Sequence, residues 1–275
     1  MIKISVLSFL ILIFSCNQPI KKQEATIENN NLSIALTVQK NPNFKIIHVF
    51  VALCDNAHQG IVKVPPKIGN GQDAENNLYW GCDYGIKTFF KKQKNWNFVQ
   101  TVKNPRDKVL ERCVFKYKSE NVYLVADAYD GEFIKNCTID FLQSCAGNFN
   151  DFFKENNDTI ACGGNSDLLA YIGHDGLMEF SITEILKPKN YYKRETIVLA
   201  CISKNYFQSY LKQTNAESLI YTTGLMAPEA YTLVAAVEGW INQKSKSEIR
   251  ELSAQAYNKY QQCGINGARN LFVTE

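Results

Sequence analysis

The sequence contains no C-x-x-C pair and only three histidines in 275 residues. This argues against a zinc ribbon and against a dithiol redox motif, and we expect neither a metal nor a cofactor. Basic residues are spread along the chain, the net charge is only +3, and no short window combines them with aromatic residues. Nucleic-acid binding therefore has no support. No G-x-G-x-x-G follows the first apolar run, which argues against a nucleotide-binding Rossmann-like protein.

Long hydrophobic runs are confined to the N-terminus, "MIKISVLSFLILIFSC". Lys3, a short apolar stretch and Ser15-Cys16 are typical of an export signal, and "IFSC" resembles a bacterial lipobox. We predict a lipoprotein signal peptide over residues 1–16, with Cys16 lipidated and the protein anchored in the bacterial cell envelope, on the periplasmic side or at the surface. A plain cleaved signal and an uncleaved anchor are the alternatives. The polar run over residues 17–40 is predicted to be a flexible tether.

No internal repeat and no second linker divide the remaining residues 41–275, which we predict to form one domain. Five short apolar runs without alternation are typical of strands buried on both faces. They cover residues 45–53, 122–128, 168–173, 196–201 and 218–223. Helical periodicity marks residues 77–92, 132–147, 205–213, 228–243 and 247–264. Alternation of strand and helix predicts an α/β three-layer sandwich with a mostly parallel sheet.

Eight cysteines besides Cys16 leave two interpretations open in an exported protein, a set of disulfides or several buried thiols that act as small apolar residues.

Two of the predicted strands end in residues that can perform proton or thiol chemistry. "LLAYIGHDG" places His174 after one strand, and "TIVLAC" ends the next in Cys201. Parallel sheets bind ligands beyond the carboxyl ends of their strands, so neighbouring strands would bring the imidazole and the thiol to one site. His174 could then act as general base and acid for a Cys201 nucleophile, and the helix that follows would lower the pKa of the thiol. The backbone at Gly176 and Cys201 could hold an oxyanion.

These two blocks resemble the strand motifs of the caspase-like cysteine peptidases, a superfamily that includes caspases, metacaspases, gingipains, legumains and the CHAT group. In that superfamily one strand ends in His-Gly and a later one in Ala-Cys; the matching positions are His174, Gly176 and Cys201, with Asp175 inserted before the glycine. The resemblance implies a caspase-hemoglobinase fold, a Cys/His dyad, and hydrolysis of peptide bonds through an acyl-enzyme. It covers about 40 residues, and the interval from histidine to cysteine is 27 residues.

Several polar residues follow predicted strands and are candidates for a substrate pocket: Asp55, Asp73, Asp127, Asp175 and Thr222. Each also has a purely structural alternative, as a turn residue or helix cap. His174 and Cys201 could likewise be an ordinary capping histidine and a core cysteine. A metal or redox role would involve His48, Cys54 and His58, although His48 lies inside an apolar strand.

The sequence therefore predicts an exported lipoprotein cysteine hydrolase that acts on proteins or peptides. The alternative is a catalytically inactive caspase-like protein that binds a partner in the cell envelope, an alternative favoured by the inserted Asp175.

Overall fold

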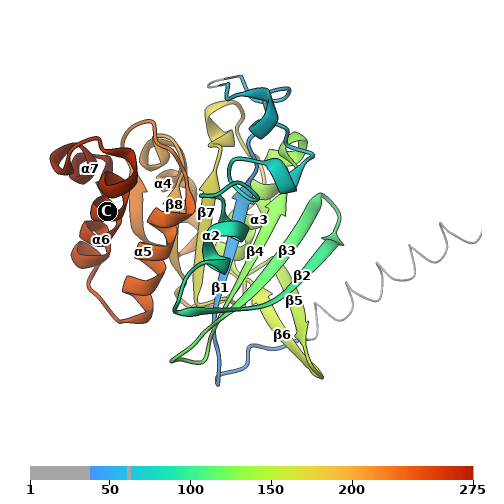
Figure 1. Ribbon diagram of the computed structural model, residues 1–275. Coiled ribbons are helices and arrows are strands. Elements are labelled where there is room, and N and C mark those ends of the chain that lie inside the picture. Colours follow the sequence, from blue (N-terminus) through green and yellow to red (C-terminus); the bar gives the residue numbers. More distant parts are fainter. Residues whose placement is uncertain (1–37, 61–62, 275) are drawn as a thin grey trace, which may run out of the picture. The chain divides into compact units, whose positions relative to one another are not determined.

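An eight-stranded mixed sheet runs through the protein (Figure 1). The computed structural model describes residues 38–60 and 63–274. The predicted signal peptide, Cys16 and most of the predicted tether lie outside these residues. The last residue of that tether, Lys40, is described, and its ammonium group bonds to Asp167 at 2.5 Å. The folded part of the chain thus begins before residue 41, earlier than predicted.

The order of the strands is β10-β9-β8-β7-β1-β4-β3-β2. The five strands from β9 to β4 run parallel, whereas β10, β3 and β2 are antiparallel to their neighbours. The strands are β1 (Lys45–Ala52), β2 (Trp96–Arg106), β3 (Val109–Tyr117), β4 (Val122–Tyr129), β7 (Leu168–Gly173), β8 (Glu195–Leu199), β9 (Glu217–Thr222) and β10 (Phe272–Val273). A separate hairpin pairs β5 (Asn150–Glu155) with β6 (Asp158–Gly163).

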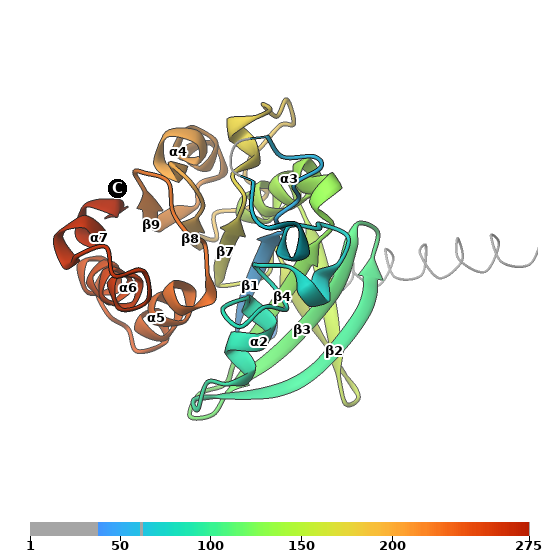
Figure 2. The same ribbon diagram turned by 45° about the horizontal axis from the view of Figure 1, so that its top comes forward.

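Helices cover both faces of the sheet, as Figure 2 shows. One face packs on α3 (Ile134–Ala146) and α4 (Ser203–Thr214). The other packs on α2 (Ile86–Lys91), α5 (Ala230–Ile241) and α6 (Lys246–Gln261). Short elements complete the chain: η1 (Pro66–Ile68), η2 (Ala74–Asn76), η3 (Gly131–Phe133), η4 (Gly176–Met178) and α7 (Ile265–Leu271). This arrangement confirms the predicted α/β class with a mostly parallel sheet, and it is compatible with a three-layer sandwich.

Continuous burial explains why the parallel strands lack alternating polarity. All residues of β4 and β7 are buried, as are all those of β1 after Lys45. Side chains of β1 alternate between the two cores, with Val49 and Val51 on one side and Phe50 on the other. None of the helices that the structure describes is both long enough and apolar enough to cross a membrane.

The helix predicted over residues 77–92 is shorter in the structure, where only Ile86–Lys91 is helical. The preceding residues form turns around Asn77, whose carbonyl accepts hydrogen bonds from the backbone of Trp80, Gly81 and Cys82. A Cβ atom on Gly81 would lie 1.8 Å from the carbonyl oxygen of Glu75, so this turn requires glycine. Apolar residues at helical spacing were misleading here because the glycines permit a tighter path.

A buried ionic network fixes the hairpin of β5 and β6 against the sheet. The guanidinium of Arg112, on β3, contacts Asp127 on β4 at 2.6 and 2.7 Å and Asp151 on β5 at 2.5 Å. Burial opposes ionisation of Asp127, but Arg112 outweighs it and holds the pKa of that carboxyl well below its usual range. Asp127 is therefore engaged in a structural ion pair, the alternative to its predicted role in a substrate pocket.

His48 belongs to the same network and explains a cluster that otherwise resembles a metal site. Ligand atoms of His48, Asp151 and Cys162 lie within 4.8 Å of one another. However, His48 Nε2 is 3.1 Å from Asp127, its Nδ1 accepts a hydrogen bond from the backbone of Gly163, and Asp151 is held by Arg112. Because these nitrogen and oxygen atoms already have hydrogen-bond partners, we do not propose a metal at this cluster.

Replacing Arg112 with Met should lower the free energy of unfolding at pH 7 by about 3 to 5 kcal/mol, because two carboxylates lose their buried cation. The matched control Lys92→Met breaks an exposed pair with Asp83 and should cost less than about 1 kcal/mol. The lowered pKa of Asp127 stabilises the wild type above a pH of about 4, and this contribution is lost as the pH falls further. Urea unfolding at pH 7 and at lower pH should therefore show a smaller acid-induced loss for Arg112→Met. Equal losses in both chains would contradict this role for the network.

Candidate functional site

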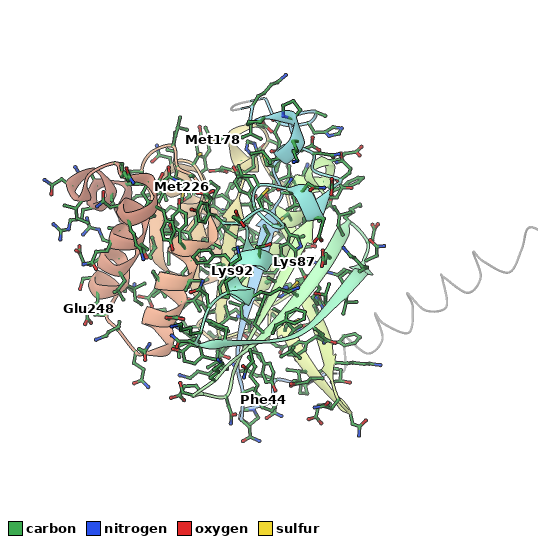
Figure 3. The ribbon with its side chains drawn as sticks, viewed as in Figure 1. Phe44, Lys87, Lys92, Met178, Met226 and Glu248 are labelled. Atoms are coloured by element: carbon green, nitrogen blue, oxygen red, sulfur yellow. The ribbon has the colours of Figure 1, made fainter. Side chains whose placement is uncertain are left out.

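His174 and Cys201 follow neighbouring parallel strands at equivalent positions. In the register of β7 and β8, Ile172 pairs with Leu199. Each candidate residue lies two positions beyond its member of that pair. The prediction that the two strands are adjacent and end at one edge is therefore confirmed. Two residues labelled in Figure 3 mark this carboxyl edge: Met178, the last residue of η4, and Met226, which follows β9. Phe44 lies at the opposite edge.

Cys201 lies in a sharp turn between β8 and α4. The next residue, Ile202, adopts the left-handed region with φ 50° and ψ 32°, which is unusual for a β-branched side chain. Its N–H donates to the carbonyl of Gly224 at 2.9 Å. Ser203 then begins the helix, and its hydroxyl donates to the carbonyl of Val198 at 2.9 Å. The chain thus reverses direction at the thiol.

Thr222 stabilises this turn. Its hydroxyl accepts a hydrogen bond from the N–H of Ser203 at 3.1 Å and donates to the carbonyl of Ala200. The residue is completely buried. Thr222 therefore ties β9 to the turn of Cys201, and the alternative as a capping residue replaces its predicted role in a pocket.

The thiol of Cys201 is partly buried and contacts the backbone of Met226. The N–H of Met226 lies 3.5 Å from the sulfur, and the thiol is 3.7 Å from the carbonyl of the same residue. Burial raises the pKa of the Cys201 thiol, and the nearby Asp175 carboxyl raises it further, although the Met226 backbone acts in the opposite direction. The expected lowering of this pKa is thus wrong for the resting geometry. Burial is the largest cause of this shift.

The imidazole of His174 is paired with an acid that the sequence did not reveal. Its Nε2 lies 3.4 Å from Glu179 Oε2, and the other oxygen of Glu179 accepts the N–H of Gly60 at 2.8 Å. Burial lowers the pKa of His174, and Glu179 opposes that shift. Among the described residues no hydrogen bond joins this ring to the thiol of Cys201. The only sequence signal for Glu179 is an acid shortly after the histidine, in a segment that forms the η4 turn.

The backbone of His174 is held firmly on both sides. Its N–H donates to the carbonyl of Ala52 at 3.2 Å, and its carbonyl accepts the Tyr171 hydroxyl at 2.7 Å. Gly173, with φ 128°, approaches Ala52 so closely that a Cβ atom would lie 2.1 Å from the Ala52 carbonyl oxygen. The glycine before the histidine is therefore required by strand packing.

Asp175 is completely buried beside this histidine. Its Oδ1 accepts the N–H of Leu177 at 3.0 Å, while its buried Oδ2 has no hydrogen-bond partner among the described residues. Burial raises the pKa of the Asp175 carboxyl to about 7, although the backbone of Leu177 and Met178 opposes the shift. Near neutral pH, a substantial fraction of this carboxyl is protonated and able to donate a hydrogen bond.

Gly176, the candidate for an oxyanion site, has a packing reason to be glycine. A Cβ atom there would lie 2.6 Å from the ring of Phe180. Its carbonyl accepts the N–H groups of Glu179 and Phe180, which closes the η4 turn. The oxyanion role of Gly176 and Cys201 remains a prediction.

The loop after β1 brings Asp55 to the same edge. Burial opposes ionisation of Asp55, but hydrogen bonds from Gln72 and His58 outweigh it and lower the pKa of the carboxyl. Asp55 lines a shallow recess together with Asn56, Asn70 and Gln72. Asp73 instead caps η2 through the N–H of Asn76, so of these two acids only Asp55 keeps a place beside a recess.

Tyr79 lies near the thiol of Cys201 and near one further acid, Glu229. Burial raises the pKa of the Tyr79 hydroxyl, and the charges of Cys54 and Cys201 contribute to that shift. Burial likewise raises the pKa of Glu229, whose carboxyl accepts the hydroxyl of Tyr231 at 2.8 Å. Sequence reasoning did not identify Glu229, because it follows a loop and no strand.

All eight cysteines of the described residues are free thiols. Five of them, among them Cys113 and Cys162, are buried in the core, and burial is the largest cause that raises the pKa of these two thiols. The interpretation of buried reduced cysteines is therefore the one that this structure supports, over a set of disulfides.

Replacing Glu179 with Gln should lower the pKa of His174 further, because it removes the negative charge that opposes desolvation. Proton NMR titration can follow this change, since the chain has only three histidines. The matched control Glu132→Gln removes a charge near His58 and should lower the pKa of His58 alone. A His174 pKa that does not respond to Glu179→Gln would rule out the pairing.

Comparison with protein-family models, with curated proteins and with solved structures finds no match for this chain. The resemblance of its two strand motifs to caspase-like peptidases therefore has no support beyond the residues that carry it. What the site can do must be inferred from its own geometry.

Proposed function

We propose that the protein is a cysteine hydrolase of the caspase-like type, acting on proteins or peptides, with Cys201 as nucleophile and His174 as general base and acid. The observation that carries the proposal is the register of β7 and β8, which places both residues at equivalent positions beyond adjacent parallel strands. Backbones of adjacent strands are about 4.8 Å apart, which allows an imidazole and a thiol to meet by side-chain rotation. The mostly parallel sheet with helices on both faces agrees with the fold that the resemblance implies.

The Cys201 sulfur attacks the carbonyl carbon of the substrate as its thiol proton passes to His174. The tetrahedral intermediate then collapses as His174 returns the proton to the leaving amine. Water, deprotonated by the same imidazole, releases the acyl group from sulfur. Because burial raises the pKa of the thiol at rest, this proton moves during attack and no ion pair is formed beforehand.

Rotation of the thiol from Met226 toward His174 is the one rearrangement that this mechanism requires. Glu179 Oε2 lies 3.4 Å from the imidazole Nε2 without a hydrogen bond, and this carboxylate would stabilise the imidazolium that forms when His174 takes the thiol proton. An ionised Asp175 disfavours the Cys201 thiolate by charge repulsion, and protonation of Asp175 removes that repulsion. Of the predicted pocket acids, Asp55 lines a recess and remains a candidate for contact with substrate, whereas Asp175 is completely buried.

A binding protein without turnover is the second candidate. The observation that favours it is the resting geometry, in which the thiol contacts Met226 and the imidazole contacts Glu179. In this case the carboxyl edge would bind a peptide or an envelope partner, and the free Oδ2 of Asp175 would serve recognition. Reactivity of the thiol separates the two candidates.

Cys201→Ala and His174→Ala should each reduce peptide hydrolysis by about a thousandfold or more, and the double variant should lose little beyond either, because the two residues act as a unit. The free energy of unfolding should change by no more than about 1 kcal/mol for Cys201→Ala, since only one partly buried sulfur is removed. The control Cys263→Ala removes an exposed thiol and should retain full activity. Labelling with iodoacetamide should modify Cys201 and slow after His174→Ala. If a broad peptide panel is not cleaved and His174→Ala leaves the labelling rate of Cys201 unchanged, the binding protein is the better account.

We also propose that Cys16 carries lipid and anchors the protein in the cell envelope. The support is the lipobox-like "IFSC" after an apolar stretch. Metabolic labelling with palmitate should mark the wild type and should not mark Cys16→Ser. The control Cys263→Ser should keep the label. Label that persists in Cys16→Ser would exclude this site of lipidation.

A further inference from the structure

The loop between η4 and β8 forms an exposed surface at the edge opposite to Cys201. The end of α3 holds this loop, because Gln143 donates to the carbonyl of Ile185 at 3.1 Å and the N–H of Lys189 donates to the carbonyl of Ala146 at 2.8 Å. Helices that connect parallel strands run against them, so the ends of α3 and α4 lie where the strands begin. In Figure 3, Phe44 just before β1 marks this edge.

The exposed residues of the loop combine apolar and basic character. Tyr191 is 100% exposed, Ile185 81% and Tyr192 39%. Lys187 and Lys189 are exposed, and neither has an ion-pair partner in the part of the chain that the structure describes. We call these five residues the basic-aromatic patch. Strongly exposed apolar side chains on one loop, here Tyr191 and Ile185, indicate a contact surface.

Two of the acids near the patch already have cationic partners. Asp167 bonds to Lys40 and to the hydroxyl of Tyr192, and Glu217 is paired with Lys193 and Lys246. Lys212, in the last turn of α4, is exposed, and its neighbour Gln213 lines a recess together with Ile185 and Lys187. Glu184 lines the same recess and offsets one positive charge, so Lys187, Lys189 and Lys212 together leave the surface with a net positive charge.

The described chain also begins beside this patch. Residue 38 is the first described, and Lys40 bonds to Tyr192 within the patch. Tyrosine rings favour the interface of a bilayer, and each lysine close to an anionic lipid surface contributes about 1 kcal/mol to binding.

We propose that the basic-aromatic patch rests on an anionic phospholipid surface. The ring of Tyr191 and the side chain of Ile185 would enter the headgroup region, while Lys187 and Lys189 would contact lipid phosphates. The edge that carries His174 and Cys201 would then face away from the membrane. This inference extends the proposed membrane anchorage through Cys16, but it does not depend on the hydrolase activity.

Limited proteolysis of the full chain on vesicles tests the proposal, because chymotrypsin cleaves after exposed tyrosines. Cleavage after Tyr191 should be slower on vesicles of phosphatidylcholine with phosphatidylglycerol than on phosphatidylcholine alone. The expected factor is about fivefold or more, which corresponds to one engaged lysine. Tyr84 is 44% exposed and lies near the start of α5 at the opposite edge, so its cleavage rate should be equal on both vesicles.

The variant Lys187→Glu/Lys189→Glu should abolish the protection of Tyr191. The matched control Lys63→Glu/Lys67→Glu makes the same change in net charge on the loop after β1. This control should retain the protection of Tyr191. Equal cleavage of Tyr191 on both vesicle types, or protection that survives the Lys187→Glu/Lys189→Glu change, would overturn the proposal. Flotation tests the lipid anchor separately. A chain that floats only with anionic vesicles and shows protection of Tyr191 binds through the patch without a lipid anchor. A chain that floats with neither type of vesicle has neither the lipid anchor nor binding through the patch.

Discussion

Strand β1 pairs in parallel with β4 on one side and with β7 on the other, and this central arrangement determines where every later segment can go. A parallel pair requires a crossover between its strands, and right-handed crossovers on opposite sides of β1 place helices on both faces. The same pairing sends the loops after β1, β7 and β8 to one edge. The proximity of Asp55, His174 and Cys201 at that edge follows from the topology and does not require any special interaction among them.

Burial of the central strands in turn imposes an electrostatic constraint on the antiparallel half of the sheet. Asp127, on β4, is completely buried, so its charge needs a cation from a neighbouring element. The guanidinium of Arg112, on β3, is that cation, and it also bonds to Asp151 on the β5–β6 hairpin. Register errors in β3 would leave several charges buried without partners, which makes the network a specificity device for this part of the fold.

Sequence patterns predicted the parallel half of the fold well, because strands buried on both faces are continuous apolar runs. Strand β7 has the predicted bounds, and β4, β8 and β9 differ from them by one or two residues. Strand β2 was not predicted because most of its residues are exposed or partly exposed, so it has neither an apolar run nor a regular alternation. A hairpin at the edge of a sheet is defined by its partner more than by its own composition.

The candidate site was predictable in its location but only partly in its contacts. His174 and Cys201 were placed correctly at one edge, because strand ends can be read from apolar runs. The partners of these residues, Glu179 and the Met226 backbone, come from turns that have no periodic signal. The sequence left both a pocket role and a structural role open for Asp127 and Thr222, because a polar residue at a strand end is equally suited to a buried ion pair, a helix cap or a ligand.

The left-handed conformation of Ile202 has a consequence for how the site tolerates change. A β-branched residue in this region costs on the order of 1 to 3 kcal/mol, and it persists only where neighbouring contacts enforce it. Those contacts come from Gly224 and from the hydroxyls of Thr222 and Ser203, at the end of β9 and the start of α4. The direction of the Cys201 side chain is therefore inherited from a segment more than twenty positions later in the chain. Sequence drift at the end of β9 would move the thiol without altering either residue of the dyad.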